Sequence, residues 1–494
     1  MLSMEATSNF TLPGFFANKS VFLTGATGYV GRALLEKILR GCPEVAKVFV
    51  LVRGEHGKSP EERINEILGT TLFQRVRDME LDLLKKVIPV SGDVTFDGLG
   101  ISPEDSLALR EEISVVIHSA ANVNFGAGLK ELLKANLEGT QNTLEWAKQL
   151  TNLKAFVYIS TAFSNSDQLK IEEKVYPTRI DPRAAMKLYS VDLPEALVDA
   201  IIPQLLGDHK LEYTFTKNLA EGLIQESRFD LPVCIVRPAV VGPAYQEPFP
   251  GWIDNFKGFT GGFHAMSKGI VRVFYTNKSG TVDIVPIDLV VNLTIAAAMS
   301  RSINQSKEVQ VFNCSTSDHP YVNVKDIAVE AIKQCPPNKI YWYPSVIMVR
   351  SRLLARILDF FLHYMLALIA DGVLVLIGKR PKTSVTEIYD KMKKLEALTL
   401  KLVEVEYDIS IENTKDLYKK LTPEDQDLFN FDICGVNQNS YIQRGVYGLR
   451  RYAAGEKDEH LPAARENMRR YYWYYMASWG VFFLIVTLLI RLFA

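Results

Sequence analysis

The sequence of 494 residues contains few cysteines and little net charge. Its five cysteines are far apart and lack CxxC or Cys/His spacing, which argues against a disulfide framework and against a zinc site. The formal net charge is -1, so the one-sided basic field of a nucleic-acid-binding protein is missing. We therefore expect a protein of a reducing compartment that binds neither a metal ion nor nucleic acid.

A leader pattern is also missing. Residues 1–16 contain no basic stretch followed by an apolar one, so we expect no secretory signal. Hydrophobic residues make up 48% of the chain and charged residues 23%, which is typical of a globular protein with large cores. At about 150 residues per domain, the length predicts two or three domains.

Short β-branched runs alternate with segments of helical periodicity in the first half of the chain. Runs such as VFVLV and SVVIH are typical of strands buried on both faces. This alternation predicts right-handed crossovers and a parallel sheet with helices on both faces and ligands at the carboxyl ends of the strands. We predict strands at Ser20–Thr24, Val48–Val52, Val87–Val90, Val115–His118, Phe156–Ile159 and Val233–Val236. We predict helices at Val30–Leu39, Glu61–Leu68, Leu129–Gln149 and Glu212–Arg228.

A glycine-rich motif, TGATGYVG, runs from Thr24 to Gly31 and joins the first predicted strand to the first helix. Gly25 permits a tight turn, Gly28 lets the backbone approach a pyrophosphate, and Gly31 permits close packing of helix on strand. The start of the helix directs free N–H groups and a positive dipole end towards phosphates. Between a strand and a helix, this motif predicts a dinucleotide site.

Residues at other strand ends predict which dinucleotide binds. An NAD-selective site has an acidic residue after the second strand, where this sequence has Arg53, and Arg32 follows the third glycine. Arginine attracts a 2′-phosphate, so we predict NADPH. Asp93 follows the third strand and is expected to accept a hydrogen bond from the adenine amino group. The small residues Ser119–Ala121 follow the fourth strand and leave room for the cofactor.

Tyr213 and Lys217 lie four residues apart in YTFTK, inside a predicted helix, and therefore project from one face. A lysine ammonium lowers the pKa of a nearby tyrosine, so we predict that Tyr213 gives a proton to a carbonyl oxygen as hydride reaches the carbon. The fifth strand ends at Ser160 and Thr161, whose hydroxyls are suited to hold that oxygen. We assign this role to Thr161, with Ser160 as the alternative.

The ordered motifs TGATGYVG, GDV, HSAANVNF, YISTAF, YTFTK and RPAVVGP resemble an extended short-chain dehydrogenase/reductase. The stretch EPFPGWIDNFKG (Glu247–Gly258) is similar to fatty acyl-CoA reductases in particular, and the C-terminal region resembles their sterile-type domain. The likeness covers nearly the whole chain. It implies that a long-chain fatty acyl-CoA is reduced with two NADPH to a primary alcohol, through an aldehyde and with release of CoA.

The resemblance also implies roles for individual residues. Tyr213 is the expected proton donor, Lys217 its partner on the nicotinamide ribose, and Thr161 the hydroxyl that binds the oxyanion. No metal ion is needed. The residues expected to contact the cofactor are Thr24, Gly25, Thr27, Gly28, Tyr29, Val30, Gly31, Arg32, Arg53, Asp93, Val94, Ser119, Ala120, Ala121, Tyr213, Lys217 and Pro238.

Two apolar segments in the second half point to a membrane. Tyr471–Ile490 carries no formal charge, has nearly the ~20 residues needed to cross a bilayer, and begins with an aromatic belt. A pair of arginines precedes it, so we predict a tail anchor that leaves the catalytic part in the cytosol, at the endoplasmic reticulum or a peroxisome. Leu353–Ile377 contains four polar interruptions, which a spanning helix tolerates poorly, and we interpret it as a helical hairpin or an interfacial segment. The interruptions are Arg356, Asp359, His363 and Asp371.

The predicted fold is therefore α/β: a doubly wound Rossmann-type parallel sheet with a smaller substrate region, then a mainly helical C-terminal domain and a C-terminal transmembrane helix. We expect an N-terminal segment (1–18), an NADPH-binding domain (19–335), a helical sterile-type domain (336–468) and an anchor (469–494).

Two other functions stay open. One is a membrane-attached sterol or hydroxysteroid dehydrogenase, and the other is a non-catalytic NADPH-binding scaffold at the membrane. The oligomeric state also stays open.

Overall fold

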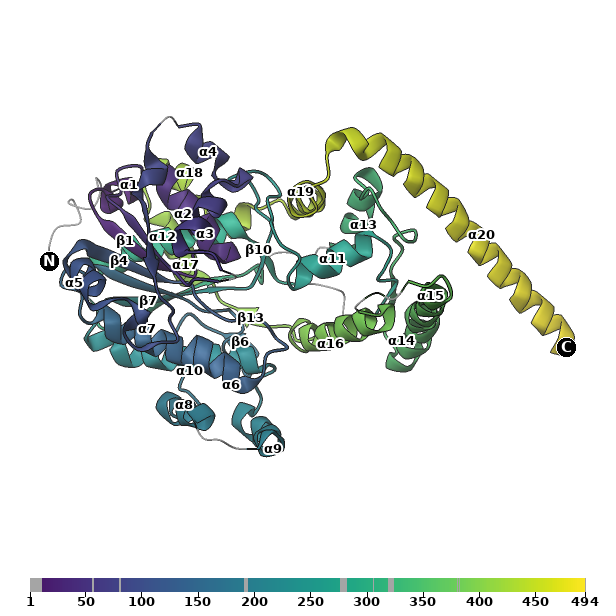
Figure 1. Cartoon of the computed structure of the whole chain (residues 1–494), viewed down its shortest axis with the longest axis horizontal. Coiled ribbons are helices and arrows are strands. Elements are labelled where there is room, and N and C mark those ends of the chain that lie inside the picture. The colour runs from purple at the N-terminus through teal and green to yellow at the C-terminus, as the bar shows by residue number, and fades with distance from the viewer. Residues whose placement is uncertain are drawn as a thin grey trace.

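A seven-stranded parallel sheet in the order β11-β7-β5-β4-β1-β2-β3 forms the centre of the protein (Figure 1). The structure is a computed structural model that describes residues 11–493 except 56, 80, 191–193, 276–281, 305, 319–323, 380 and 382. The sheet strands are β1 (Ser20–Thr24), β2 (Val48–Val52), β3 (Val87–Ser91), β4 (Ile113–His118), β5 (Ala155–Ile159), β7 (Val233–Pro238) and β11 (Gln310–Cys314).

The six predicted strands are confirmed, and their order is that of a doubly wound sheet. The seventh strand, β11, was not predicted. It lies at the edge of the sheet beside β7 and includes the polar residues Gln310 and Asn313, so it lacks the continuous apolar run of the central strands.

Helices cover both faces of the sheet. Side chains alternate in direction along β1, so Val21 and Leu23 join one core and Phe22 joins the other, where its ring lies 4.4 Å from that of Trp146. The first core includes α1 (Leu12–Phe16), α2 (Tyr29–Gly41) and α12 (Ile287–Ile303). The second includes α5 (Pro103–Glu112), α7 (Gly139–Ala147) and α10 (Glu212–Glu226).

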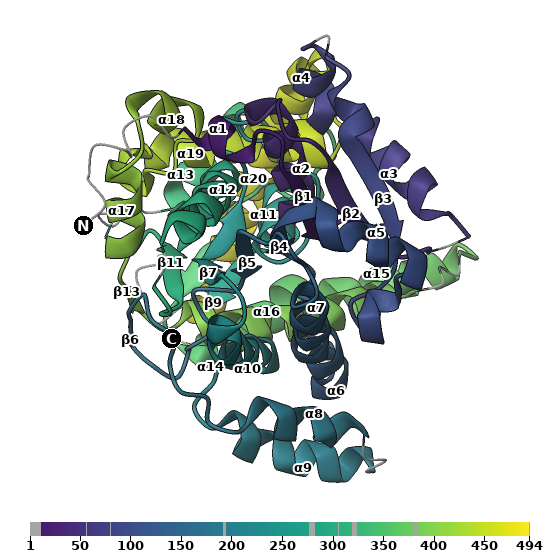
Figure 2. The ribbon, with the colours of Figure 1, turned by 90° about the vertical axis from the view of Figure 1, so that its left-hand side faces the viewer.

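Part of the C-terminal half packs against the helices that cover one face of this sheet. Ile409, Leu417, Phe429 and Val436 belong to the same core as α2 and α12. They lie in or near β13 (Asp408–Ile409), α17 (Glu412–Lys419) and α18 (Pro423–Leu428), and Figure 2 shows α17 and α18 beside α1 and α12. Residues 11–18 include α1 and are also part of this core, whereas residues 1–10 of the predicted N-terminal segment lie outside the described residues.

The rest of the C-terminal half is mainly helical and lies to one side of the sheet (Figure 1). Its helices are α13 (Val324–Gln334), α14 (Arg352–Asp359), α15 (Met365–Leu376), α16 (Val385–Val403), α19 (Gln438–Gly448) and α20 (Leu461–Phe493). A π-helical turn, Phe360–Tyr364, joins α14 to α15, so Arg352–Leu376 is one continuous helix. The hairpin interpretation of Leu353–Ile377 is therefore wrong, because the polar interruptions do not break the helix.

Two helices present long apolar surfaces. Among the described residues, Arg352–Leu376 is the one helix long and apolar enough to cross a membrane, with a mean hydropathy of 1.8. The predicted anchor Tyr471–Ile490 forms the C-terminal part of α20, which extends away from the body of the protein (Figure 1). Its large exposed side chains include Trp473, Val481, Phe482, Phe483, Leu484, Leu488 and Ile490.

Candidate active site

The predicted site residues gather along one edge of the sheet, because the carboxyl ends of parallel strands share an edge. Thr24 ends β1 and leads into the glycine turn and α2. Tyr213 and Lys217 lie on α10, which approaches this edge from the second face. The others follow β2 (Arg53), β3 (Asp93, Val94), β4 (Ser119, Ala120, Ala121) and β5 (Thr161), or end β7 (Pro238).

The glycine turn depends on the absence of side chains at two positions. Gly25 has a φ of +73°, and a Cβ there would lie 2.7 Å from the Ala120 nitrogen. A Cβ at Gly31 would lie 2.1 Å from the Gly25 carbonyl oxygen. The positive φ of Gly25 confirms its predicted role in the tight turn, whereas Gly31 packs closely on that turn, at Gly25 and Ala26, and its predicted packing on the strand stays a prediction.

The first turn of α2 is open to an anion. Gly28 is its N-cap, and no side chain caps the helix there, so its first N–H groups are available to phosphates. The Tyr29 side chain turns away, donating a hydrogen bond to the Gly242 oxygen at 2.9 Å and stacking on Trp252 with ring centroids 5.3 Å apart. The predicted contact of Tyr29 with a cofactor therefore stays a prediction for its backbone alone.

The two arginines predicted to bind a 2′-phosphate differ in their surroundings. Arg53 has a side chain that is 62% exposed, with long ion pairs to Glu55 (3.8 Å) and Asp93 (3.7 Å). Arg32 pairs with Asp254 of the PGWIDN stretch at 2.9 Å. Arg53 is thus more exposed and more loosely paired with carboxylates than Arg32, and its guanidinium is the more accessible of the two to a phosphate.

A short hydrogen-bond chain connects the ends of β1 and β4. The Thr24 hydroxyl lies 2.7 Å from His118 Nδ1 and accepts a hydrogen bond from the Ala120 N–H at 3.2 Å. Burial, and then the charge of Lys217, lowers the pKa of His118 to about 3, so its ring is neutral. The chain fixes the Ser119–Ala121 loop beside the glycine turn.

Tyr213 is half-buried on the face of α10 that meets the strand ends, with its ring centroid 5.5 Å from that of Phe125. Burial raises its pKa well above the usual value. We expected Lys217 to lower this pKa, but burial determines the shift. The phenol therefore keeps its proton, as a proton donor requires.

Lys217 is buried and directed at β5. Its ammonium donates hydrogen bonds to the Ile159 carbonyl oxygen (2.8 Å) and the Tyr158 hydroxyl (3.2 Å) and lies 4.6 Å from the centre of the Tyr158 ring. Burial lowers the pKa of Lys217 to about 7, while the Glu221 carboxylate acts in the opposite direction. Its charge is therefore sensitive to nearby groups close to neutral pH.

The two hydroxyls after β5 have different partners. Ser160 is buried and donates a hydrogen bond to Glu221 at 2.5 Å. The Thr161 hydroxyl has longer contacts, to the Pro238 oxygen at 3.4 Å and from the Phe163 N–H at 3.3 Å. The Ser160 hydroxyl is therefore engaged by a carboxylate, whereas Thr161 is more loosely held.

Asn136 connects α10 to the loop after β4 and was not predicted. It lies in a π-helical turn, Leu133–Glu138, of the kind often found at functional sites. Its side chain accepts a hydrogen bond from the Asn122 N–H (2.7 Å) and donates to the Asn122 carbonyl (3.0 Å) and the Thr216 hydroxyl (3.1 Å). The HSAANVNF loop is therefore held against α10.

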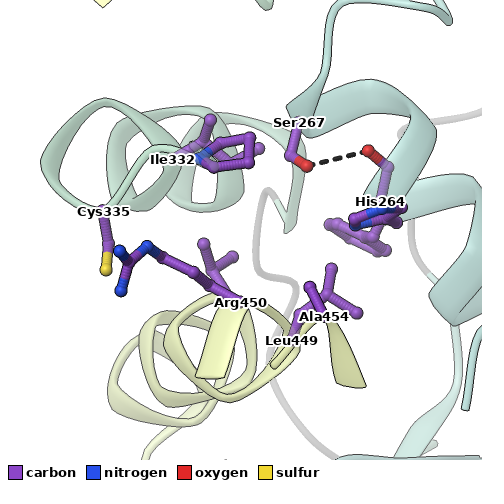
Figure 3. A pocket seen from close by; sticks show the side chains of 10 residues that line it. His264, Ser267, Ile332, Cys335, Leu449, Arg450 and Ala454 are labelled. Atoms are coloured by element: carbon purple, nitrogen blue, oxygen red, sulfur yellow. Dashed lines mark hydrogen bonds between the residues drawn. The ribbon is translucent and has the colours of Figure 1, made fainter. Parts of the chain in front are cut away.

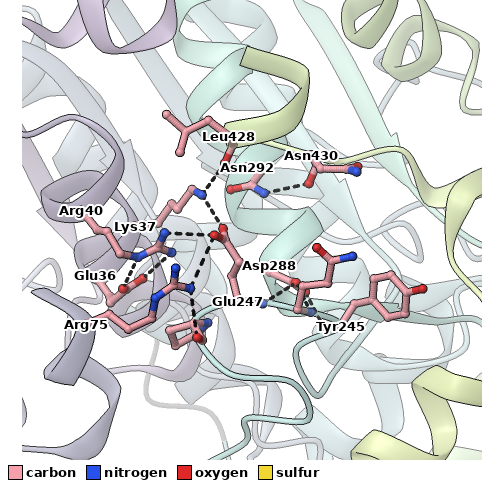
Figure 4. A network of polar contacts seen from close by, with 12 residues as sticks. Glu36, Lys37, Arg40, Arg75, Tyr245, Glu247, Asp288, Asn292, Leu428 and Asn430 are labelled. Atoms are coloured by element: carbon pink, nitrogen blue, oxygen red, sulfur yellow. Dashed lines mark hydrogen bonds and ion pairs between the residues drawn. The ribbon is translucent and has the colours of Figure 1, made fainter. Parts of the chain in front are cut away.

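A polar network fastens the loop at Glu247 to α2 (Figure 4). The Glu247 carboxylate accepts hydrogen bonds from Lys37 and from Arg40 (3.0 Å), both on α2. Lys37 also donates to the Leu428 carbonyl at 2.6 Å. Asp288 on α12 accepts hydrogen bonds from three consecutive backbone N–H groups that end at Glu247, at 2.7 to 3.0 Å. The start of EPFPGWIDNFKG is thus tied to the helix that follows the glycine turn.

A small hollow lies outside this site, between α11 (Phe259–Ser267), α13 and the residues after α19 (Figure 3). None of the predicted site residues lines it. Its charged member, Arg450, pairs with Asp458 at 3.0 Å. The lining residues are Phe263, His264, Ser267, Ile332, Cys335, Pro337, Val446, Leu449, Arg450 and Ala454.

Comparisons with known proteins show the family to which the chain belongs. Two family models, both described as Male sterility protein, match residues 23–294, where the model is of an NAD-binding domain, and residues 362–456. Fatty acyl-CoA reductase 1 of Xenopus laevis is 36% identical over 465 residues, covering 93% of this chain and 89% of that protein. The chain belongs to the fatty acyl-CoA reductase family. Fatty acyl-CoA reductase 2 of Mus musculus is 32% identical over 483 residues, covering 97% of this chain and 93% of that protein.

Solved structures support the fold of this fatty acyl-CoA reductase family member. The reductase domain of a nonribosomal peptide synthetase from Mycobacterium tuberculosis has a TM-score of 0.56 and 19% identity, covering 87% of this chain and 92% of that domain. The terminal R domain of the myxalamid pathway has a TM-score of 0.54 and 21% identity, covering 91% and 95%. The resemblance predicted from the motifs is confirmed, and a nicotinamide cofactor is supported.

Proposed function

We propose that this chain reduces long-chain fatty acyl-CoA to the primary alcohol, through an aldehyde, with NADPH as the reductant and with release of CoA. One observation carries the proposal. A chain that is 36% identical to a fatty acyl-CoA reductase over 93% of its length also gathers Tyr213, Lys217 and Thr161 at the sheet edge beside the glycine turn.

The glycine turn fits a dinucleotide. A Cβ at Gly25 or Gly31 would collide with backbone atoms, and the uncapped start of α2 supplies N–H groups for a pyrophosphate. Arg53, exposed after β2, is the preferred partner of a 2′-phosphate, which favours NADPH over NADH. When bound, the cofactor supplies hydride to the thioester carbonyl carbon and, in a second round, to the aldehyde.

In the proposed mechanism, three side chains act on the substrate carbonyl oxygen and on the proton that it receives. Tyr213 donates the proton that burial retains on its phenol to the carbonyl oxygen. The Thr161 hydroxyl donates a hydrogen bond to the same oxygen as negative charge develops there. Lys217 in its charged form stabilises the phenolate that Tyr213 leaves behind. The hydroxyl proton then returns to the Tyr213 phenolate as the carbonyl re-forms and the carbon–sulfur bond breaks, and the CoA thiolate that leaves takes up a proton from water.

A membrane holds the enzyme near its substrate. Tyr471–Ile490 in α20 is the proposed anchor, because its exposed apolar side chains extend from the body of the protein. The arginine pair before it favours the cytosol for the catalytic part, at the endoplasmic reticulum or a peroxisome.

The helix Arg352–Leu376 is the proposed interfacial element, since its acidic side chains turn towards the protein. Asp359 accepts a hydrogen bond from Tyr389 and pairs with Lys393 at 3.2 Å, and Asp371 accepts one from the Val385 N–H at 2.7 Å. Apart from Arg352 and Arg356 near its start, the strongly exposed side chains of this helix are apolar, which is typical of a helix that lies in the membrane surface. These residues, each at least 45% exposed, are Leu353, Leu354, Ile357, Phe360, Phe361, Leu368, Ile369, Val373, Val375 and Leu376.

One assay separates this proposal from the two alternatives. Membranes that contain the protein are given NADPH with acyl-CoAs of different chain length or with hydroxysteroids, and free CoA is measured with a thiol reagent. We expect CoA release that requires NADPH. Steroid turnover without CoA release would favour the steroid dehydrogenase, and NADPH binding with no turnover of either substrate would favour the scaffold.

A further inference from the structure

Glu221 is a buried carboxylate directly behind the catalytic pair. It lies on α10 four residues beyond Lys217, and the side chain is 1% exposed. One oxygen accepts hydrogen bonds from the Ser160 hydroxyl (2.5 Å) and from Arg237 Nε (2.8 Å), and the other from Arg237 Nη2 (2.6 Å). The carboxylate therefore joins α10 to the end of β5 and to β7.

Arg237 fixes the other side of this network. It lies on β7, is fully buried, and also donates hydrogen bonds to the carbonyl oxygens of Glu172 (3.1 Å) and Lys174 (2.9 Å). A buried ion pair of this kind is weak evidence for stability, because removing both charges from water costs about as much as the pairing returns. Its place between the catalytic helix and the strand that carries Ser160 suggests a role in the reaction.

Glu221 is the acidic group among the titratable side chains near Lys217. The titratable side chains that interact with it are Tyr158 on β5, His118 on β4 and Glu221 on its own helix, where Tyr213 lies one turn earlier. His118 is neutral, and the two tyrosines carry their protons because burial raises both pKa values. Glu221 thus supplies the negative charge next to the ammonium.

We propose that Glu221 is a positioning residue that keeps Lys217 charged and holds Ser160 so that the adjacent Thr161 hydroxyl faces the substrate oxygen. This inference rests on the proposed function, in which Lys217 acts as an ammonium and Thr161 binds the oxyanion. Glu221 touches neither substrate nor cofactor and acts through these two residues.

The proposal predicts a change in pH dependence. Burial lowers the pKa of Lys217 to about 7, and Glu221 opposes that effect. Without the carboxylate, the ammonium is less favourable and its pKa falls further, so Lys217 loses its proton at a lower pH. Because reduction requires the ammonium, the basic limb of the pH profile of kcat/KM should move down by about 1–3 pH units, the usual effect of one nearby charge.

The test compares full-length Glu221→Gln with the wild type in the acyl-CoA reduction assay across pH. Glu226→Gln is the matched control, because Glu226 lies on the same helix but is exposed and pairs with Arg183 at the surface. A double variant, Glu221→Gln with Arg237→Gln, removes both buried charges and leaves no unpaired arginine if the single variant folds poorly. Lys217→Ala is assayed in parallel to test the proposed function itself.

We expect the basic limb to shift in Glu221→Gln and in the double variant but not in Glu226→Gln. If folded Glu221→Gln, or the double variant, keeps the basic limb of the wild-type pH profile of kcat/KM, the inference is overturned, even if thermal stability falls. If Lys217→Ala retains full activity, the proposed function fails instead, and the two failures are therefore distinguishable.

Discussion

Tyr213 and Lys217 lie on one face of α10, and burial shifts the pKa of each towards its neutral form. For Tyr213 this shift retains the proton that the proposed reaction consumes. For Lys217 it brings the pKa to about 7, so that the groups bound beside it decide its charge. In the proposed mechanism, the chemistry of the site depends on this pair.

Replacing Tyr213 tests that assignment. Tyr213→Phe removes the hydroxyl and leaves the ring against Phe125, so we expect reduction to fall by roughly 10²–10⁴-fold while NADPH binding is retained. NADPH oxidation and NADPH fluorescence titration measure the two effects. Tyr341→Phe, at an exposed position, is the control. Substantial alcohol formation by Tyr213→Phe would show that another group donates the proton.

Cofactor choice is expected to depend on Arg53 more than on Arg32. A charge-assisted contact to the 2′-phosphate is worth roughly 1.5–3 kcal/mol, or about 10- to 150-fold in Kd. Arg53→Ala should weaken NADPH by this factor and leave NADH nearly unchanged, whereas Arg32→Ala should affect both cofactors alike because Asp254 engages its guanidinium. Titrations of both variants with both cofactors measure the ratio. An unchanged ratio in Arg53→Ala would place the specificity elsewhere.

The sequence identifies the glycine turn, Tyr213 and Lys217 because each belongs to a motif of fixed local spacing. Asn136, Glu221 and Arg237 belong to no such motif. Their roles depend on partners far along the chain: Thr216 for Asn136, and Ser160 for Glu221. Such pairs meet only through the crossovers of the sheet, so local spacing does not predict them.

The polar network at Glu247 links two elements, α2 and the loop that follows β8 (Val240–Gly242). Glu247→Gln should lower the free energy of unfolding towards the lower end of about 3–5 kcal/mol, since Lys37 would be left buried and Glu247 itself is 23% exposed. Thermal unfolding measures the loss. Glu66→Gln, which breaks the exposed pair with Lys58, should cost about 0–1 kcal/mol. Equal losses in both variants would mean that the network contributes no more than a surface pair.

The sequence predicts helices and strands correctly where periodicity is strong, and incorrectly where tertiary contacts determine the local structure. The central strands are apolar at nearly every position and are found as predicted. In Leu353–Ile377 the polar residues suggested a break, but Asp359 and Asp371 find partners on or beside α16, so the helix continues. β11 is held by its pairing with β7, which local sequence does not reveal.

The whole molecule combines a catalytic body with two apolar helices. The predicted domain boundary between residues 335 and 336 stays a prediction. Ile409–Val436 lies in the predicted C-terminal domain but contributes to the core around the sheet. The packing of this segment depends on contacts with α2 and α12, which are distant in the sequence, so local sequence patterns do not predict it.

Truncation after Arg470 separates the roles of the two apolar helices. The shortened protein should be released from carbonate-washed membranes, because the proposed anchor is lost. It should still bind vesicles loosely through Arg352–Leu376 and retain activity on soluble short-chain acyl-CoA, since the sheet and α10 are intact. Vesicle flotation and activity assays measure these effects. Resistance of the truncated protein to carbonate would mean that Arg352–Leu376 is itself embedded.

The most direct test of the account is the stoichiometry of a single reaction mixture. Full-length protein in vesicles is given NADPH and a long-chain acyl-CoA, and oxidised NADPH, free CoA and lipid products are measured together. We predict two NADPH oxidised for each CoA released, with the primary alcohol as the product. A ratio of one with accumulating aldehyde, or NADPH oxidation without CoA release, would contradict the account.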